Sequence, residues 1–185
     1  MNYPTGIKKD HNRLINYKNR GMDLESDLNQ SNTYYIDNDI AYIYKKPTPI
    51  QVSKVEFINK GAIIKEAFYK EPSTTDYNGI YKGHYIDFEA KETKNKTSFP
   101  LANIHLHQYK HLENIERHGG IGFIIVRFTL LDETYLLKAS DLFYFTNNNK
   151  RKSIPLTFFK KRGFLIKEGY NPRLDYLKIV DTFWR

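Results

Sequence analysis

The segment DFEAK, residues 87–91, places three ionisable side chains at alternating positions. In a β-strand, alternate side chains project from the same face, so Asp87, Glu89 and Lys91 would share one face. The residues between them are apolar and would face a core. A solvated surface strand carries such charges without further consequence. An active site that needs oxygen ligands for a metal ion, together with a nearby cation, would use the same arrangement.

Asp76 lies thirteen residues before Glu89, at the end of a turn-rich stretch that would bring it beside the strand. Carboxylate oxygens are the ligands that Mg²⁺ and Mn²⁺ prefer. Such an ion activates water and neutralises charge on a phosphodiester, and the ammonium group of Lys91 would add a fixed positive charge. The pattern D-x12-E-x-K is degenerate by itself, but it favours Asp76, Glu89 and Lys91 as catalytic residues and the two carboxylates as metal ligands.

The composition of the chain suits a polyanionic partner. Its 185 residues are 40% hydrophobic, which is enough for one domain with a substantial core. The net charge of +8 favours nucleic acid first and an anionic membrane second, and the 15 Tyr and 12 Phe add rings able to stack on bases. The absence of cysteine excludes disulfides, thiolate metal sites and a cysteine nucleophile. No apolar run approaches ~18 residues and the N-terminus is polar, so we expect a cytoplasmic protein without membrane contact.

The pattern along the chain predicts an α/β fold, in which a mixed central sheet is flanked by helices. Residues 1–20 are expected to form a flexible basic arm, and residues 21–185 a single domain. Two strand-like runs separated by NKG predict a hairpin that projects from the body at about 47–71. DYNG (76–79) and YKG (81–83) are interpreted as turns. The other expected elements are helices at 21–38, 100–118, 140–145 and 173–184, and strands at 40–46, 84–92, 120–128 and 133–139.

The helix expected at 100–118 is rich in histidine. His107 and His111 have the i, i+4 spacing that zinc sites use, but no H-E-x-x-H motif is present. We therefore interpret this helix face as phosphate-facing or solvated.

Four segments of the sequence resemble the hallmark segments of the RecU-type Holliday junction resolvases, and the resemblance runs from about residue 12 to the end. It implies a restriction-endonuclease-like core, a homodimer, and Mg²⁺- or Mn²⁺-dependent cleavage of four-way DNA junctions by paired nicks. The segments are NRGMDLESDLN (19–29), KKPTPIQV (45–52), STTDYNGIYKGHYIDFEAKETKNKTSFPL (73–101) and GYNPRLDYLKIV (169–180).

The resemblance also implies roles for individual residues. The catalytic set falls on Asp76, Glu89 and Lys91. Thr74 and Asp87 join Asp76 and Glu89 as metal-binding candidates, although Asp87 would equally serve as a hydrogen-bonded support. Glu25 is either an accessory acid or a residue that interacts with the helix dipole. Tyr69, or Phe68 beside it, would wedge at the junction centre. The DNA-binding candidates are Arg20, Lys46, Lys54, Lys65, Tyr69 and Gln108.

The sequence thus predicts a structure-specific endonuclease that acts in homologous recombination and DNA repair, and the family resemblance implies that it leaves 5′-phosphate ends. Other recombination proteins are possible further partners. Two alternatives stay open: a duplex endonuclease of the same fold, and a junction-binding architectural protein that does not cleave.

Overall fold

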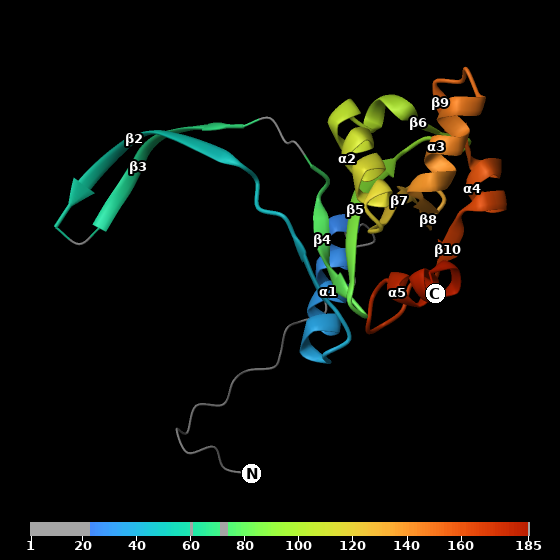
Figure 1. Ribbon diagram of the computed structural model, residues 1–185, viewed down its shortest axis with the longest axis horizontal. Helices are drawn as coiled ribbons and strands as arrows, with labels where there is room; N and C mark the ends of the chain where they lie inside the picture. Colours follow the sequence, from blue (N-terminus) through green and yellow to red (C-terminus); the bar gives the residue numbers. More distant parts are fainter. Residues whose placement is uncertain (1–22, 60, 71–73, 185) are drawn as a thin grey trace, which may run out of the picture.

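The computed structural model describes residues 23–59, 61–70 and 74–184 (Figure 1). The expected basic arm at 1–20 lies outside the described residues. The helices are α1 (Leu24–Asp37), the 3₁₀ turn η1 (Leu101–Asn103), α2 (Leu106–Arg117), α3 (Ala139–Asn148), α4 (Leu156–Arg162) and α5 (Tyr176–Phe183). The strands are β1 (Tyr42–Lys45), β2 (Ile50–Ile58), β3 (Gly61–Tyr69), β4 (Tyr77–Tyr81), β5 (His84–Thr93), β6 (Ser98–Pro100), β7 (Ile121–Phe128), β8 (Glu133–Lys138), β9 (Ser153–Pro155) and β10 (Phe164–Ile166).

The central sheet has six strands in the order β1-β4-β5-β7-β8-β10. Strands β5 and β7 are parallel, and every other neighbouring pair in this sheet is antiparallel. Parallel neighbours need a crossover connection, and here the segment containing α2 supplies it. The expected mixed sheet flanked by helices is therefore confirmed.

Each face of the sheet packs against its own set of helices. Strand β7 is buried along its whole length, and its side chains alternate between two cores. Phe123 and its alternate neighbours pack with α1 and α5. Ile124 and its alternate neighbours pack with α2, α3 and α4. Among the described residues, no helix combines the length and apolar character that crossing a membrane would require.

The interpretation of 76–79 as a turn is wrong, because Tyr77, Asn78 and Gly79 lie in strand β4. Gly79 lies inside β4, and a Cβ atom there would collide with the carbonyl oxygen of Tyr42 on β1. Glycine is needed at this point for the close approach of two backbones. The turn expected at 81–83 is confirmed: it is the two-residue link Lys82–Gly83, where both φ angles are positive (48° and 80°).

The helix expected at 100–118 is interrupted. Pro100 ends strand β6, and the N–H group of Leu101 bonds to the carbonyl of Lys152. After η1, helix α2 begins at Leu106 and ends at Arg117. The helix expected at 140–145 is longer than predicted, since α3 begins at Ala139 and ends at Asn148.

The hairpin formed by β2 and β3 projects from the body, as expected (Figure 1). Every described residue in the two strands is exposed. An isolated two-stranded hairpin is at best marginally stable in water, so contact with another molecule would stabilise it. Its exposed large apolar side chains are Ile50, Val52, Val55, Phe57, Ile58, Ile63, Ile64, Phe68 and Tyr69.

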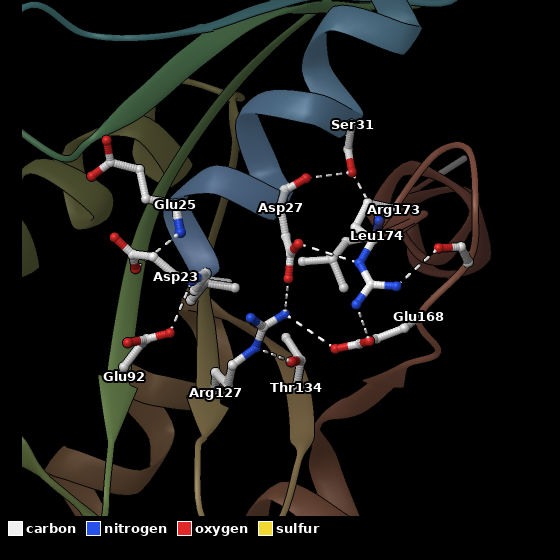
Figure 2. A network of polar contacts seen from close by, with 12 residues as sticks. Asp23, Glu25, Asp27, Ser31, Glu92, Arg127, Thr134, Glu168, Arg173 and Leu174 are labelled. Atoms are coloured by element: carbon white, nitrogen blue, oxygen red, sulfur yellow. Dashed lines mark hydrogen bonds and ion pairs between the residues drawn. The ribbon is translucent and has the colours of Figure 1, made fainter. Parts of the chain in front are cut away.

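A buried ionic network fixes helix α1 to the sheet (Figure 2). Asp27 on α1 is 1% exposed and accepts from Arg127 of β7 at 2.6 Å and from Arg173 at 3.2 Å. Glu168 contacts both arginines, so each charge in the network has a partner. The first residue of α1 is also bonded to strand β5, because the side chain of Glu92 accepts the N–H of Leu24 at 2.9 Å.

Candidate active site

Strands β4 and β5 bring the first two carboxylates together. The antiparallel register pairs Tyr77 with Phe88, which places Asp76 opposite Glu89. The backbone N–H of Asp76 donates to Glu89 Oε2 at 3.1 Å. The thirteen-residue spacing in the sequence thus corresponds to a tight hairpin that returns the chain to the same end of the sheet.

Glu89 is the centre of this cluster. Its side chain is 0% exposed, and its Oε1 atom lies 2.7 Å from Lys91 Nζ. The Gln108 amide also donates to Oε1 at 2.7 Å. Burial raises the pKa of Glu89 to about 8; hydrogen bonding to Asp76 and its negative charge add to this rise, while Lys91 opposes it. Such a strongly perturbed pKa is typical of functional sites.

Gln108 belongs to the carboxylate cluster. It lies in the first turn of α2, where its Oε1 accepts the N–H of His105 at 2.9 Å. This bond fixes the amide so that its nitrogen reaches Glu89. The family resemblance likens Gln108 to polar residues near the active site of related nucleases, and the sequence interpretation also grouped it with the DNA contacts. In the structure it is a direct neighbour of Glu89, a predicted catalytic residue.

Asp87 lies on the same face of β5 and is fully buried. Its Oδ2 accepts from Lys46 Nζ at 2.7 Å, from the Tyr85 hydroxyl at 2.9 Å and from His111 Nε2 at 3.0 Å. Its Oδ1 accepts from the Thr75 hydroxyl. The charged face of β5 is therefore a buried polar cluster and not a solvated surface.

Two neighbours of Asp87 were not predicted as site residues. Tyr85 precedes Asp87 by two positions and so shares its face of the strand, which is the signal that would have found it. His111 follows Gln108 by three positions on α2, so both side chains reach β5 from one helix face. This contact corrects the interpretation of the histidine-rich face as solvated or phosphate-facing, at least for His111.

An open cavity of about 210 Å³ adjoins Asp76. It lies where the chain leaves the body for the hairpin. A larger cavity of about 420 Å³, lined by Trp184 and Asp181 among others, lies on α5 and β4, away from the carboxylate cluster. The smaller cavity is the relevant one, because the predicted ligand Asp76 lines it. Its lining residues are Lys45, Lys46, Pro47, Thr48, Pro49, Thr74, Thr75 and Asp76.

The remaining candidates lie in other environments. Thr74 is half-buried, and its hydroxyl donates to the carbonyl of Thr75 at 3.3 Å. Glu25 pairs with Lys45 at 2.5 Å, beside the cavity. Three candidates, Lys54, Lys65 and Tyr69, are exposed on the hairpin, and Arg20 lies outside the described residues.

The oxygen donors at this site suit a hard divalent cation. Within the described part of the chain, no three His, Cys, Asp or Glu side chains form a group able to hold a metal ion. An ion here would therefore rest on Asp76 and Glu89, completed by neutral oxygens such as that of Thr74 and by water. Two carboxylates and a lysine at one end of a sheet are side chains that could support metal-assisted hydrolysis.

Comparison with known proteins identifies the family. The family described as Recombination protein U (RecU) matches residues 19–182. A protein named Holliday junction resolvase RecU from Bacillus mycoides (strain KBAB4) is 50% identical over 196 residues, covering 100% of this chain and 98% of the relative. A protein of the same name from Bacillus cereus (strain G9842) is 53% identical over 172 residues, covering 91% and 86%. The chain belongs to the RecU family.

Among solved structures, the chain resembles Hjc, a Holliday junction resolvase from Archaeoglobus fulgidus. The TM-score is 0.42 at 8% identity, and the alignment covers 72% of this chain and 90% of Hjc.

Proposed function

We propose that this protein is a structure-specific DNA endonuclease that resolves four-way junctions by paired, metal-dependent nicks during recombination and repair. The observation that carries the proposal is the Glu89 cluster, in which Asp76, Lys91 and Gln108 meet one buried carboxylate in a RecU-family chain. The names of the relatives support the choice of a junction as substrate.

Asp76 and Glu89 would hold Mg²⁺ or Mn²⁺, with the Thr74 hydroxyl nearby. The bound ion would supply a water of lowered pKa and neutralise charge on the phosphodiester. Gln108 and the N–H of Asp76 orient the Glu89 carboxylate. Because Glu89 is fully buried, its orientation is set by these contacts and not by solvent.

Lys91 provides the fixed positive charge beside the reacting phosphate. Its side chain is 21% exposed, so it can reach a substrate while it contacts Glu89. In the proposed hydrolysis, the water oxygen bonds to phosphorus, the P–O3′ bond breaks, and the leaving 3′ oxygen gains a proton. The products are 5′-phosphate and 3′-hydroxyl ends, which a ligase can rejoin.

A homodimer explains paired nicks. A four-way junction has approximate two-fold symmetry, so an isologous dimer presents two sites to two strands of like polarity. The exposed apolar side chains of the hairpin, apart from Phe68 and Tyr69, supply a surface for the second copy. Lys46, Lys54, Lys65 and Tyr69 would contact the DNA around the hairpin, Arg20 would add a contact from the N-terminal arm, and Glu25 would act as an accessory acid.

The decisive experiment compares a synthetic four-way junction with a matched linear duplex, in Mg²⁺ and in EDTA. We expect paired nicks on the junction alone, only with Mg²⁺. Glu89→Gln and Lys91→Ala should lose cleavage by at least about 100-fold and retain junction binding. Lys178→Ala, an exposed lysine on α5, is the matched control and should cleave normally.

The other outcomes select between the alternatives. Equal cutting of the linear duplex would indicate an ordinary duplex endonuclease. Junction binding without cleavage in any divalent metal would indicate an architectural protein.

A further inference from the structure

We infer that Asp87 is not a metal ligand but a positioning residue, which fixes the root of the β2–β3 hairpin against the segment that carries Asp76. The hairpin root is residues 46–49, between the end of β1 and the start of β2. The inference rests on the proposed function. It adds a structural coupling between the hairpin, which would contact the DNA, and the site that would cleave it.

The carboxylate of Asp87 accepts from more donors than the Glu89 carboxylate, which accepts from Asp76, Gln108 and Lys91. An ionised carboxylate accepts about four hydrogen bonds. Asp87 receives four, from Thr75, Lys46, Tyr85 and His111, and its side chain is 0% exposed. A divalent ion on Oδ2 would have to displace the Lys46 ammonium, which lies 2.7 Å away.

Lys46 connects Asp87 to the predicted ligand Asp76. Its backbone N–H donates to the carbonyl of Asp76 at 2.7 Å. Its ammonium group donates to Asp87 and, at 3.1 Å, to the Thr75 hydroxyl. Lys46 therefore holds both residues of the 75–76 segment, and Asp87 holds Lys46.

The hairpin continues directly from Lys46. Pro47 and Pro49 follow, and their fixed φ angles make the connection stiff. The returning strand is tied to the same point, because the N–H of Lys70 donates to the carbonyl of Pro49 at 3.0 Å. The orientation of the hairpin is thus linked to Asp76 through one residue.

Helix α2 holds the other side of Asp87. His111 donates Nε2–H to Asp87, since an ionised carboxylate can only accept. Gln108, one turn earlier on the same helix face, donates to Glu89. The helix thereby fixes Asp87 and Glu89 relative to each other. Lys46, held by Asp87, fixes Asp76 through its backbone hydrogen bond. DNA seated on the hairpin is consequently held in register with the cleavage site.

The test is Asp87→Asn, which keeps the shape and removes the charge that holds Lys46. We expect the single-turnover rate of junction cleavage to fall about 10- to 100-fold, in the range seen for residues that orient metal ligands. Junction affinity in EDTA should change less than about threefold, and Mn²⁺ affinity, from titration of free Mn²⁺ by electron paramagnetic resonance, should fall less than it does in Asp76→Asn.

Three further variants separate positioning from other roles. Asp76→Asn is the reference for a lost ligand and should lower Mn²⁺ affinity more than Asp87→Asn does. Glu56→Gln removes an exposed hairpin carboxylate paired with Lys65 at 2.6 Å and should leave all three measurements unchanged. Lys46→Met should slow cleavage as Asp87→Asn does, and the double variant should be no slower than either single one. Lys46→Met also tests the inference if Asp87→Asn does not fold.

Each contrary result has a distinct meaning. An Asp87→Asn variant that loses Mn²⁺ affinity as strongly as Asp76→Asn would show that Asp87 is a ligand. Wild-type cleavage rates in Asp87→Asn, or additive effects in the double variant, would overturn the coupling through Lys46. A wild-type protein that never cleaves would overturn the proposed function, and the positioning role with it.

Discussion

At the scale of single residues, the burial of Glu89 makes the metal-free protein sensitive to pH. Its folded pKa of about 8 lies above the ordinary 4.5, so between these values the folded chain holds a proton that the unfolded chain has lost. Folding stability contributed by this group must therefore fall as pH rises from about 4.5 to 8. In EDTA at pH 8, we expect Glu89→Gln to be more stable than the wild type by up to about 4 kcal/mol, because the amide carries no charge to bury.

Denaturant unfolding between pH 5 and pH 8.5, at one fixed chain concentration, measures this effect. The difference between the two proteins should be small at pH 5 and grow toward pH 8. Saturating Mg²⁺ should then stabilise the wild type at pH 8 and leave Glu89→Gln nearly unchanged. Parallel pH profiles in EDTA would contradict the raised pKa.

At the scale of elements, the position of α1 depends on the charge of Asp27. Asp27→Asn would leave the buried Arg127, and the half-buried Arg173 beside it, with too little negative charge between them. We expect a loss of about 3 kcal/mol in the free energy of unfolding. Glu113→Gln is the control, because Glu113 is half-exposed and lies 3.9 Å from its partner Arg117. Its loss should stay under about 1 kcal/mol, so equal losses in the two variants would show that the network does not stabilise the fold.

The elements themselves show what a sequence can reveal. Alternation of polar and apolar residues predicted β5, and the unbroken apolar run predicted β7. Strand β4 was missed because Asn78–Gly79 has the composition of a turn, and only the neighbouring strand β1 explains the glycine. The break between η1 and α2 depends on Lys152, which is equally remote in the chain.

The site residues also divide into those that local sequence spacing predicts and those that come from remote segments. Asp76, Glu89 and Lys91 were predicted from local spacing and family resemblance, because a hairpin brings near neighbours together. The partners of Asp87 were not predicted, since Lys46 and His111 come from segments 41 and 24 residues away. The contact between Asp27 and Arg127 joins residues 100 positions apart. Local periodicity carries no information about such pairs.

At the scale of the whole molecule, the β2–β3 hairpin exposes large apolar side chains that a single chain does not cover. Val55 and Ile64 face each other across β2 and β3 and are 40% and 51% exposed. If a second copy covers this surface, replacing both by threonine keeps the β-branched shape but weakens association. We expect the dimer dissociation constant, measured by sedimentation, to rise at least about tenfold.

The control is Leu165→Thr, which changes an exposed apolar residue on β10 at the far edge of the sheet and should leave the dissociation constant unchanged. Because paired nicks need two sites on one junction, the double variant should also release single-nicked junctions at concentrations where it is monomeric. An unchanged dissociation constant would place the second copy on another surface.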